Sequence, residues 1–432
     1  MVNNDTIFAL SSGRGKSGVA VIRISGDNLT EFAEKIICRT PVPRHAYFAN
    51  LTDDAGEIID QCVVIYFAAP YSFTGTDIIE IQSHGAPAVI LKIFQFLRTQ
   101  HMRIATPGEF SRRAFYNGKM DLSDVDGLIA LLDAQTDKQR VAALKSMMGG
   151  DSDIYTDWRM QMLKISAYAA AMTDYNSDDL PGNIDETIYE HIKTLYTAIS
   201  AALGKYNASR AITCGTNITI VGETNVGKSS LFNRIVGSAR AIVSDIPGTT
   251  RDVVSATMDI SGYMVNISDT AGLRDATDTI ERIGIERTNN EIDNADIVIH
   301  VINPNDEYTK IKPDEILVIN KSDTTKSHNV GSAIYTSAKN GDGISELMSV
   351  ITERINKITG NGESVLMINA RTYDLVKTAA EELKNAITKS NGDYDILSEH
   401  VRYAADAIGK ILGVIGTEEV LDMTFSQLCL GK

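Results

Sequence analysis

Residues 222–229 read Gly-Glu-Thr-Asn-Val-Gly-Lys-Ser, and this octapeptide constrains the fold more than any other segment of the chain. An apolar run precedes it at 218–221, and a segment with apolar residues at helical spacing follows it. Glycines at both ends of the loop permit a tight turn, so that N–H groups at the start of a helix converge on phosphates. Lys228 supplies a charge for the β- and γ-phosphates, and Ser229 offers a hydroxyl to Mg²⁺. The octapeptide therefore predicts a strand–loop–helix unit that binds a nucleotide.

Three further motifs follow short apolar runs in the order expected of one nucleotide-binding sheet. They are Asp269-Thr270-Ala271-Gly272, Asn320-Lys321-Ser322-Asp323 and Ser337-Ala338-Lys339. Ligands of an open α/β sheet bind at the carboxyl ends of its strands, where Asp269 can hold Mg²⁺ through water. Asp323 can accept two hydrogen bonds from guanine N1–H and the 2-amino group, whereas adenine offers no such pair of donors. Any one of these tetrads is common as a surface turn, but all of them in this order predict a GTPase.

Composition limits the class of protein further. The length of 432 residues suggests about three domains of ~150 residues each. A net charge of −15 argues against a broad basic surface for nucleic acid, so RNA would be held by local patches or by a partner. No signal peptide opens the chain, and no apolar run approaches the ~20 residues of a membrane span. The four widely separated cysteines fit reduced thiols, and we expect a cytoplasmic protein without a membrane segment.

The period of the apolar residues divides the chain into three kinds of sequence. Up to residue 118, β-rich runs at 19–24, 62–67 and 78–81 alternate with turns and with one helix-like stretch at 88–97. This pattern predicts an α+β domain at 1–118.

Helical periodicity begins near residue 122 and returns at 188–203, 376–387 and 401–411. Such amphipathic stripes usually form the core of a bundle. The simplest arrangement packs the two helical blocks together, so that residues 119–212 and 361–432 form one helical domain. A Ras-like α/β domain, 213–360, would then be inserted into it. The fold class predicted is thus multidomain, α+β and α/β with a helical bundle.

The group that orients the attacking water is not evident from the residues alone. Leu273 follows Asp-Thr-Ala-Gly, where Ras-type switches carry a glutamine, and a leucine cannot polarise water. Charged residues in the next segment are candidates, and their spacing does not choose between them: Asp275, Asp278, Glu281, Arg282 and Glu286. Thr250 can bring a hydroxyl to Mg²⁺, and Asn225 offers an amide oxygen beside the phosphates.

Several motifs outside the nucleotide site make the chain recognisable. They are Asp5-Thr6-Ile7, Val21-Ile22-Arg23-Ile24-Ser25-Gly26, Phe73-Thr74-Gly75, His84-Gly85, Pro107-Gly108-Glu109-Phe110-Ser111, Asp245-Ile246-Pro247-Gly248-Thr249-Thr250-Arg251-Asp252, Glu281-Arg282-Ile283-Gly284-Ile285-Glu286-Arg287 and Cys429-Leu430-Gly431-Lys432. Over essentially its whole length the sequence resembles the MnmE (TrmE) family of bacterial tRNA-modification GTPases. A GTPase of the Era or Der type would share the nucleotide motifs but neither terminus.

The resemblance implies a K⁺-activated GTPase domain that dimerises across its switch face. Asn225 would ligate K⁺ by its side chain, together with carbonyls of Ser244, Ile246 and Thr249. This K⁺ would supply the charge that an arginine finger gives elsewhere. Glu281 matches the family glutamate that positions water. The full set of expected GTP contacts is Asn225, Val226, Gly227, Lys228, Ser229, Ser230, Ser244, Asp245, Ile246, Pro247, Gly248, Thr249, Thr250, Asp269, Thr270, Ala271, Gly272, Asn320, Lys321, Asp323, Ser337, Ala338 and Lys339.

The resemblance also implies a folate site in the N-terminal domain, where a tetrahydrofolate derivative would be the one-carbon donor. Arg23, Glu80, Lys119 and Lys432 match the family positions that contact folate. From the sequence alone, Arg23 and Glu80 would ordinarily be exposed strand charges. Cys429 is either catalytic or a small buried hydrophobe.

Three functional classes follow from these features. The first is a homodimeric GTPase that acts with the flavoprotein MnmG to modify C5 of the wobble uridine, position 34, of tRNA. The second is a ribosome-assembly GTPase of the Era or Der type, which should carry a basic appendage such as a KH module; none is visible in the sequence. The third, an autonomous folate-dependent aminomethyl transferase, would not need an intact GTPase domain. The first class explains all three regions.

Overall fold

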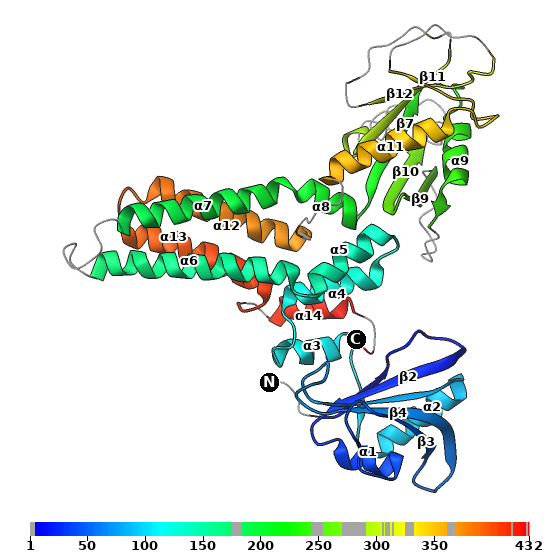
Figure 1. The fold of residues 1–432 in the computed structure, drawn as a ribbon, viewed down its shortest axis with the longest axis vertical. Helices are drawn as coiled ribbons and strands as arrows, with labels where there is room; N and C mark the ends of the chain where they lie inside the picture. Colours follow the sequence, from blue (N-terminus) through cyan, green and yellow to red (C-terminus); the bar gives the residue numbers. More distant parts are fainter. Residues whose placement is uncertain are drawn as a thin grey trace, which may run out of the picture. The chain divides into compact units, whose positions relative to one another are not determined.

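The computed structural model describes residues 5–174, 184–242, 254–269, 291–304, 306, 312, 315–324, 332–360, 366, 369–415, 418–428 and 431. The chain divides into two compact units (Figure 1). The first unit comprises Met1–Ile129, Met147–Met160 and Ala405–Lys432, and the second comprises Ala130–Ser146 and Gln161–Ala404.

A six-stranded sheet forms the centre of the first unit. Its strands lie in the order β3-β4-β5-β2-β1-β6, with every pair antiparallel except β1–β6. Apolar side chains on one face pack against α1 and α2, with Ile22, Ile24, Ile79 and Ile81 at the centre of that core. The elements are β1 (Ile7–Leu10), β2 (Ser17–Gly26), α1 (Thr30–Ile37), β3 (Ala46–Thr52), β4 (Ile58–Phe67), β5 (Asp77–Gly85), α2 (Pro87–Thr99) and β6 (Arg103–Ile104).

Three helices extend the first unit: α3 (Glu109–Tyr116), α4 (Leu122–Asp133) and α14 (Glu418–Ser426). Leu122, Val125 and Leu128 of α4 pack with Leu421 and Phe425 of α14 in a second apolar cluster. Arg112 of α3 pairs with the carboxylates of Glu418 and Asp422, at 2.7 Å each. Helices α4 and α14, which are far apart in the sequence, thus contribute to one core.

A seven-stranded sheet lies in the second unit, in the order β13-β12-β11-β7-β10-β9-β8. The first five strands of that order are parallel, whereas β9 and β8 are antiparallel. Helices α9 and α11 contribute Leu231, Phe232, Leu347 and Ile351 to its apolar core. The elements are β7 (Thr216–Gly222), α9 (Lys228–Ser238), β8 (Arg240–Ala241), β9 (Val254–Ile260), β10 (Tyr263–Asp269), β11 (Ile297–Ile302), β12 (Ile316–Ile319), β13 (Ile334–Tyr335) and α11 (Ile344–Thr359).

The remaining helices are α5 (Asp137–Met147), α6 (Gly150–Asp174), α7 (Ile184–Gly204), α8 (Tyr206–Thr213), α12 (Ala370–Lys389) and α13 (Tyr394–Leu412). Figure 1 shows α7 and α12 lying side by side, and their stripes, Ile188–Ile192–Leu195 and Val376–Ala379–Leu383, are buried. The prediction that the two helical blocks pack together is therefore confirmed for this pair. The domain boundaries drawn from the sequence stay predictions. Among the described residues, no helix combines the length and the apolarity needed to cross a bilayer.

Candidate functional site

The phosphate-binding octapeptide connects β7 to α9, as the sequence predicts. Gly222 ends the strand, and Gly227 precedes the helix with φ 96°. A Cβ on Gly222 would lie 2.2 Å from the carbonyl oxygen of Val301, and one on Gly227 would lie 2.3 Å from Asn320 Nδ2. Because neither position has room for a side chain, glycine is required at both for the loop to close around a ligand.

Lys228, Ser229 and Asp269 bring two of the motifs into contact. Lys228 is 6 % exposed, and its ammonium donates to the carbonyls of Gly222 at 3.0 Å and Glu223 at 2.8 Å. Ser229 Oγ donates to Asp269 Oδ2 at 2.6 Å, and Asp269 is buried at the end of β10. Mg²⁺ prefers hard oxygen ligands such as this hydroxyl and carboxylate. The residues present therefore fit a Mg²⁺–nucleotide site.

Asn320 ties the base-recognition motifs to the phosphate loop. Its Nδ2 donates to the carbonyl of Val226 at 2.9 Å, and its Oδ1 accepts from the Ala338 N–H at 3.1 Å. Lys321 Nζ donates to the carbonyl of Asn225 at 2.5 Å. These bonds fix the phosphate loop and both base motifs relative to one another.

Asp323 stands exposed next to this framework, and Ser337 holds it in place. The buried Ser337 hydroxyl donates to Asp323 Oδ1 at 2.7 Å and accepts from the Asn340 N–H at 3.2 Å. A carboxylate oriented in this way presents acceptors to a base that carries two adjacent donors, as guanine does.

The described part of the chain thus brings together thirteen of the expected GTP contacts in one sheet, at the carboxyl ends of β7, β10, β12 and β13: Asn225, Val226, Gly227, Lys228, Ser229, Ser230, Asp269, Asn320, Lys321, Asp323, Ser337, Ala338 and Lys339. The other expected residues lie outside the described residues; they are Ser244, Asp245, Ile246, Pro247, Gly248, Thr249, Thr250, Thr270, Ala271, Gly272 and Glu281, with Lys432 of the folate set.

Arg23 and Glu80 form a cross-strand ion pair in the first unit. They face each other across β2 and β5, with Arg23 Nη2 2.9 Å from Glu80 Oε1 and both side chains 18 % exposed. Alternation along the strands places them on the sheet face away from α1 and α2. The Arg23 guanidinium also lies 5.5 Å from the ring centroid of Phe73. A half-buried pair of this kind suits the donor and acceptor edge of a pterin.

Lys119 reaches the same loop from the end of α3. Its Cε would lie 3.2 Å from a Cβ built on Gly75, which has φ +79°. Asn117 Nδ2 donates to the carbonyl of Thr74 at 2.6 Å and fixes the loop to α3. The 73–75 loop therefore connects Arg23 with Lys119, as one ligand site would require.

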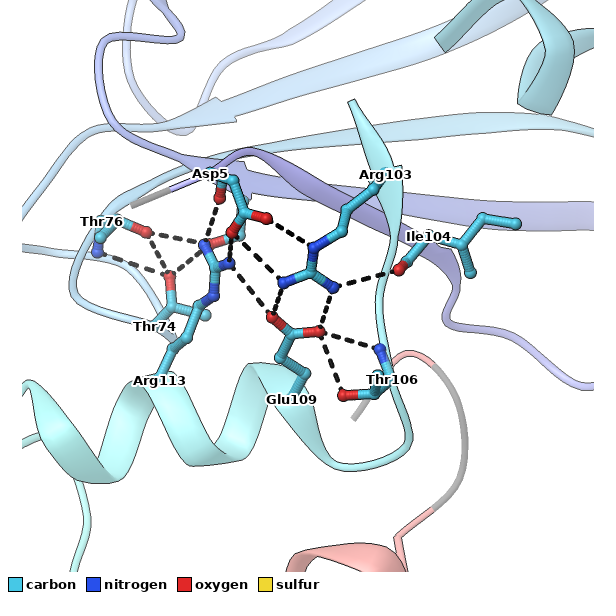
Figure 2. Close-up of polar contacts among 9 residues, drawn as sticks. Asp5, Thr74, Thr76, Arg103, Ile104, Thr106, Glu109 and Arg113 are labelled. Atoms are coloured by element: carbon cyan, nitrogen blue, oxygen red, sulfur yellow. Dashed lines mark hydrogen bonds and ion pairs between the residues drawn. The ribbon is translucent and has the colours of Figure 1, made fainter. Parts of the chain in front are cut away.

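A partly buried ion network holds the start of α3 against β1 (Figure 2). Arg103 contacts Glu109 Oε1 at 2.6 Å and Asp5 Oδ2 at 2.5 Å, and Arg113 contacts Asp5 Oδ1 at 2.9 Å. Burial opposes the charge of Glu109, but the hydrogen bonds from Arg103 and from the Thr106 N–H outweigh it and lower the pKa of Glu109 to about 2. The same carboxylate and that of Asp5 raise the pKa of Arg103.

Comparison of the sequence with known proteins shows the family of this chain. Residues 6–119 match the family described as GTP-binding protein TrmE N-terminus, and residues 122–429 match the MnmE helical domain. A relative from Brucella anthropi, named tRNA modification GTPase MnmE, is 37% identical over 435 residues, 99% of this chain and 98% of its own length. The chain belongs to the MnmE family. A second MnmE protein so named, from Parvibaculum lavamentivorans, is 36% identical over 99% of this chain and 100% of its own length.

Two solved structures are similar to part of this chain. The G domain of the T. maritima FeoB iron transporter covers 33% of this chain and 98% of its own, at 24% identity and a TM-score of 0.25. Era from Aquifex aeolicus bound to GDP·AlF4⁻ covers 38% of this chain and 66% of its own, at 22% identity and a TM-score of 0.26.

For this member of the MnmE family, the sequence did not predict the partners of Arg103 and Arg113. Arg113 is 108 positions from Asp5, and nothing in the spacing of either residue indicates the other. The family motifs at 5–7 and 107–111 include Asp5 and Glu109, but they do not indicate that these residues contact Arg103 and Arg113. A further missed residue is Gln139, whose signal was a readable Thr-x-x-Gln pattern at the start of α5.

Proposed function

We propose that the chain is a GTP-hydrolysing tRNA-modification enzyme. With the flavoprotein MnmG it would add an aminomethyl or carboxymethylaminomethyl group to C5 of the uridine at position 34. The observation that carries the proposal is full-length similarity, 37% over 99% of the chain, to a protein named tRNA modification GTPase. The contacts among the phosphate and base motifs support the GTPase part.

GTP recognition follows from the residues that meet at the sheet edge. The N–H groups of the loop after Gly222 and the Lys228 ammonium would bind the phosphates, and Asp323 would select guanine. Mg²⁺, when bound, would neutralise phosphate charge, and Ser229, Asp269 and Thr250 are the residues proposed to hold it, Asp269 through water.

Hydrolysis would depend on Glu281, which we propose orients the attacking water, because Leu273 cannot. K⁺, when bound, would add positive charge to the transition state, and Asn225 with Ser244, Ile246 and Thr249 would hold it. The backbone of Asn225 is left-handed, φ 63°, a conformation that asparagine tolerates better than most residues.

The first unit would supply the one-carbon group. Arg23, Glu80 and Lys119 would bind a tetrahydrofolate derivative around the 73–75 loop, with Lys432 as a fourth contact. MnmG would provide the flavin and most of the contact with tRNA, which accommodates the net charge of −15. We further propose a cytoplasmic homodimer whose GTP cycle drives a conformational change.

Mass spectrometry of tRNA nucleosides tests the proposal. A strain lacking the protein should lose the position-34 groups, and the wild-type chain should restore them. Arg23→Ala should fail to restore them while it retains GTPase activity. Arg98→Ala, an exposed arginine on α2, is the matched control and should restore them fully. A normal nucleoside profile in the deletion strain would reject the function.

A further inference from the structure

The side chain of Gln139 caps the start of helix α5 and is buried. Gln139 Oε1 accepts from the Thr136 N–H at 3.1 Å and from the Gln135 N–H at 3.0 Å. Thr136 is 5 % exposed and Gln139 is 8 % exposed. Capping alone uses only the oxygen of this amide, so the buried Nε2 group has a separate role.

The Nε2 group of Gln139 contacts the segments that lead into two strands of the seven-stranded sheet. It donates to the carbonyl of Thr213 at 2.8 Å and lies 3.1 Å from Met264 Sδ. Thr213 ends α8 just before β7, and Met264 is the second residue of β10. The opposite ends of these two strands carry Gly222 of the phosphate loop and Asp269.

Lys138 holds the turn between β9 and β10. Its N–H donates to the carbonyl of Gly262 at 3.1 Å, and its ammonium lies 5.3 Å from the ring centroid of Tyr263, which is buried. All seven residues of β10 pair with β9, from Tyr263 with Ile260 to Asp269 with Val254. The paired strands form a stiff hairpin, held at its turn by α5 and ending beside the nucleotide site.

The last residue of α5 belongs to the other unit. Met147 packs there against the cluster of Leu122, Leu128 and Phe425, which joins α4 to α14. Helix α14 ends at Ser426. Residues 137–146 of α5 thus belong to the second unit, and Met147 belongs to the first.

We propose that Gln139 is a positioning residue that couples the nucleotide state of the phosphate loop and Asp269 to helix α5. A packed sheet moves as a unit, so a shift at one end of β7 and β10 displaces the ends that Gln139 contacts. The amide transmits that shift to α5. The coupling is reciprocal: whatever fixes α5 changes the affinity for nucleotide by the same factor. This inference rests on the proposed GTPase cycle but not on the tRNA chemistry.

Gln139→Glu separates the contacts of Nε2 with Thr213 and Met264 from the capping of α5 by Oε1. A glutamate keeps the oxygen that accepts from the Thr136 N–H and is equally suited to a capping box. It removes the Nε2 donor and places a carboxylate beside the carbonyl of Thr213. Arg140→Gln is the matched control, because Arg140 is the next residue and pairs only with Asp137 on the exposed side among the contacts of the described residues.

Hydrogen exchange of the full chain, with GDP and with GDP plus aluminium fluoride in K⁺ buffer, tests the coupling. In the wild type and in Arg140→Gln, exchange of 137–147 should differ between the two states by about fivefold or more, the lower end of typical coupling. In Gln139→Glu this difference should vanish while the 222–229 peptide still responds and the kcat for GTP stays within about twofold.

Equal exchange of 137–147 in both states of the wild type would overturn the inference, and so would an unchanged response in Gln139→Glu. If Gln139→Glu does not fold, Lys138→Met replaces it, since it keeps the N–H bond to Gly262 and removes only the charge over Tyr263. It should reduce the difference, and an undiminished response would count against the coupling. The exchange result does not depend on tRNA, so a failure of the proposed modification chemistry leaves it intact.

Discussion

At the nucleotide site, the residue types that would contact the ligand could be predicted from the sequence. The hydrogen bonds that hold those residues in place could not. The motif spacing predicted that Asp269, Asn320 and Ser337 would lie at or just after the ends of strands, and they do so at β10, β12 and β13. It did not predict that Asn320 would bond to the carbonyl of Val226, because that contact depends on where two loops approach each other. Residues that contact a ligand form a recognisable sequence pattern. The groups that hold those residues in place are often backbone N–H and C=O groups, which every residue carries and which therefore leave no signal in the sequence.

Asp323→Asn tests base selection at this scale. The new amide donates where guanine also donates, so the affinity for GTP should fall on the order of 10⁴-fold, and xanthosine triphosphate, with its 2-oxo acceptor, should bind. Isothermal titration calorimetry measures the affinity of the variant and of the wild type for GTP and for xanthosine triphosphate. Asp342→Asn, an exposed acid on the neighbouring turn, should bind GTP as the wild type does. Unchanged GTP affinity in Asp323→Asn would remove that residue from the base site.

Helices with a regular apolar stripe could be predicted from the sequence. Helix α5, which is held by polar contacts, could not. The stripes at 188–203, 376–387 and 401–411 lie within α7, α12 and α13. Helix α5 was not singled out, because its buried residues include Gln139 and Ser146 as well as Ala143 and so form no apolar stripe. Burial of Gln139 depends on Thr213, which is 74 positions away. A polar residue at such a contact is indistinguishable in sequence from one on a solvated face.

The ion network at the start of α3 gives a pH-dependent prediction. The folded-state pKa of Glu109, about 2, is below the ordinary value of 4.5, so its ionised form stabilises the fold above 4.5 and this stability is lost as pH falls toward 2. Glu109→Gln should therefore cost up to about 3 kcal/mol at neutral pH, and the difference from wild type should shrink below pH 4.5.

Hydrogen exchange of β1 between pH 3 and 7 follows this loss locally, since Arg113 donates to the Asp5 carbonyl next to that strand at 2.8 Å. Glu31→Gln, an exposed acid in the first turn of α1, is the control and should change β1 little at any pH. A pH-independent difference between Glu109→Gln and the wild type would show that the network stabilises the fold by packing and not by charge.

Over the whole molecule, the sequence predicted which blocks meet but not how the chain divides. Helix α7 precedes the nucleotide-binding segment in the sequence and α12 follows it. Their apolar faces pack against each other, as expected. The compact units, however, cut through α6 and α13, which each contribute residues to both. Hydrophobic period identifies a helix and its buried face; it does not show where along a long helix its partners change.

The proposed potassium dependence belongs to this scale because the proposed K⁺-dependent association involves two copies of the chain. Dehydrated K⁺ needs several oxygens at a span that Na⁺ fills poorly, so GTP hydrolysis should be at least about tenfold faster in K⁺ than in Na⁺ at matched ionic strength. Sedimentation of the full chain with GDP and aluminium fluoride should show the same preference in association of the nucleotide-binding parts. Asn225→Gly is the sharper variant, because glycine keeps the left-handed backbone at φ 63° while removing the amide oxygen. It should bind GTP and lose the K⁺ advantage. Equal rates in the two salts for the wild type would rule out the K⁺ site and, with it, the role proposed for Asn225.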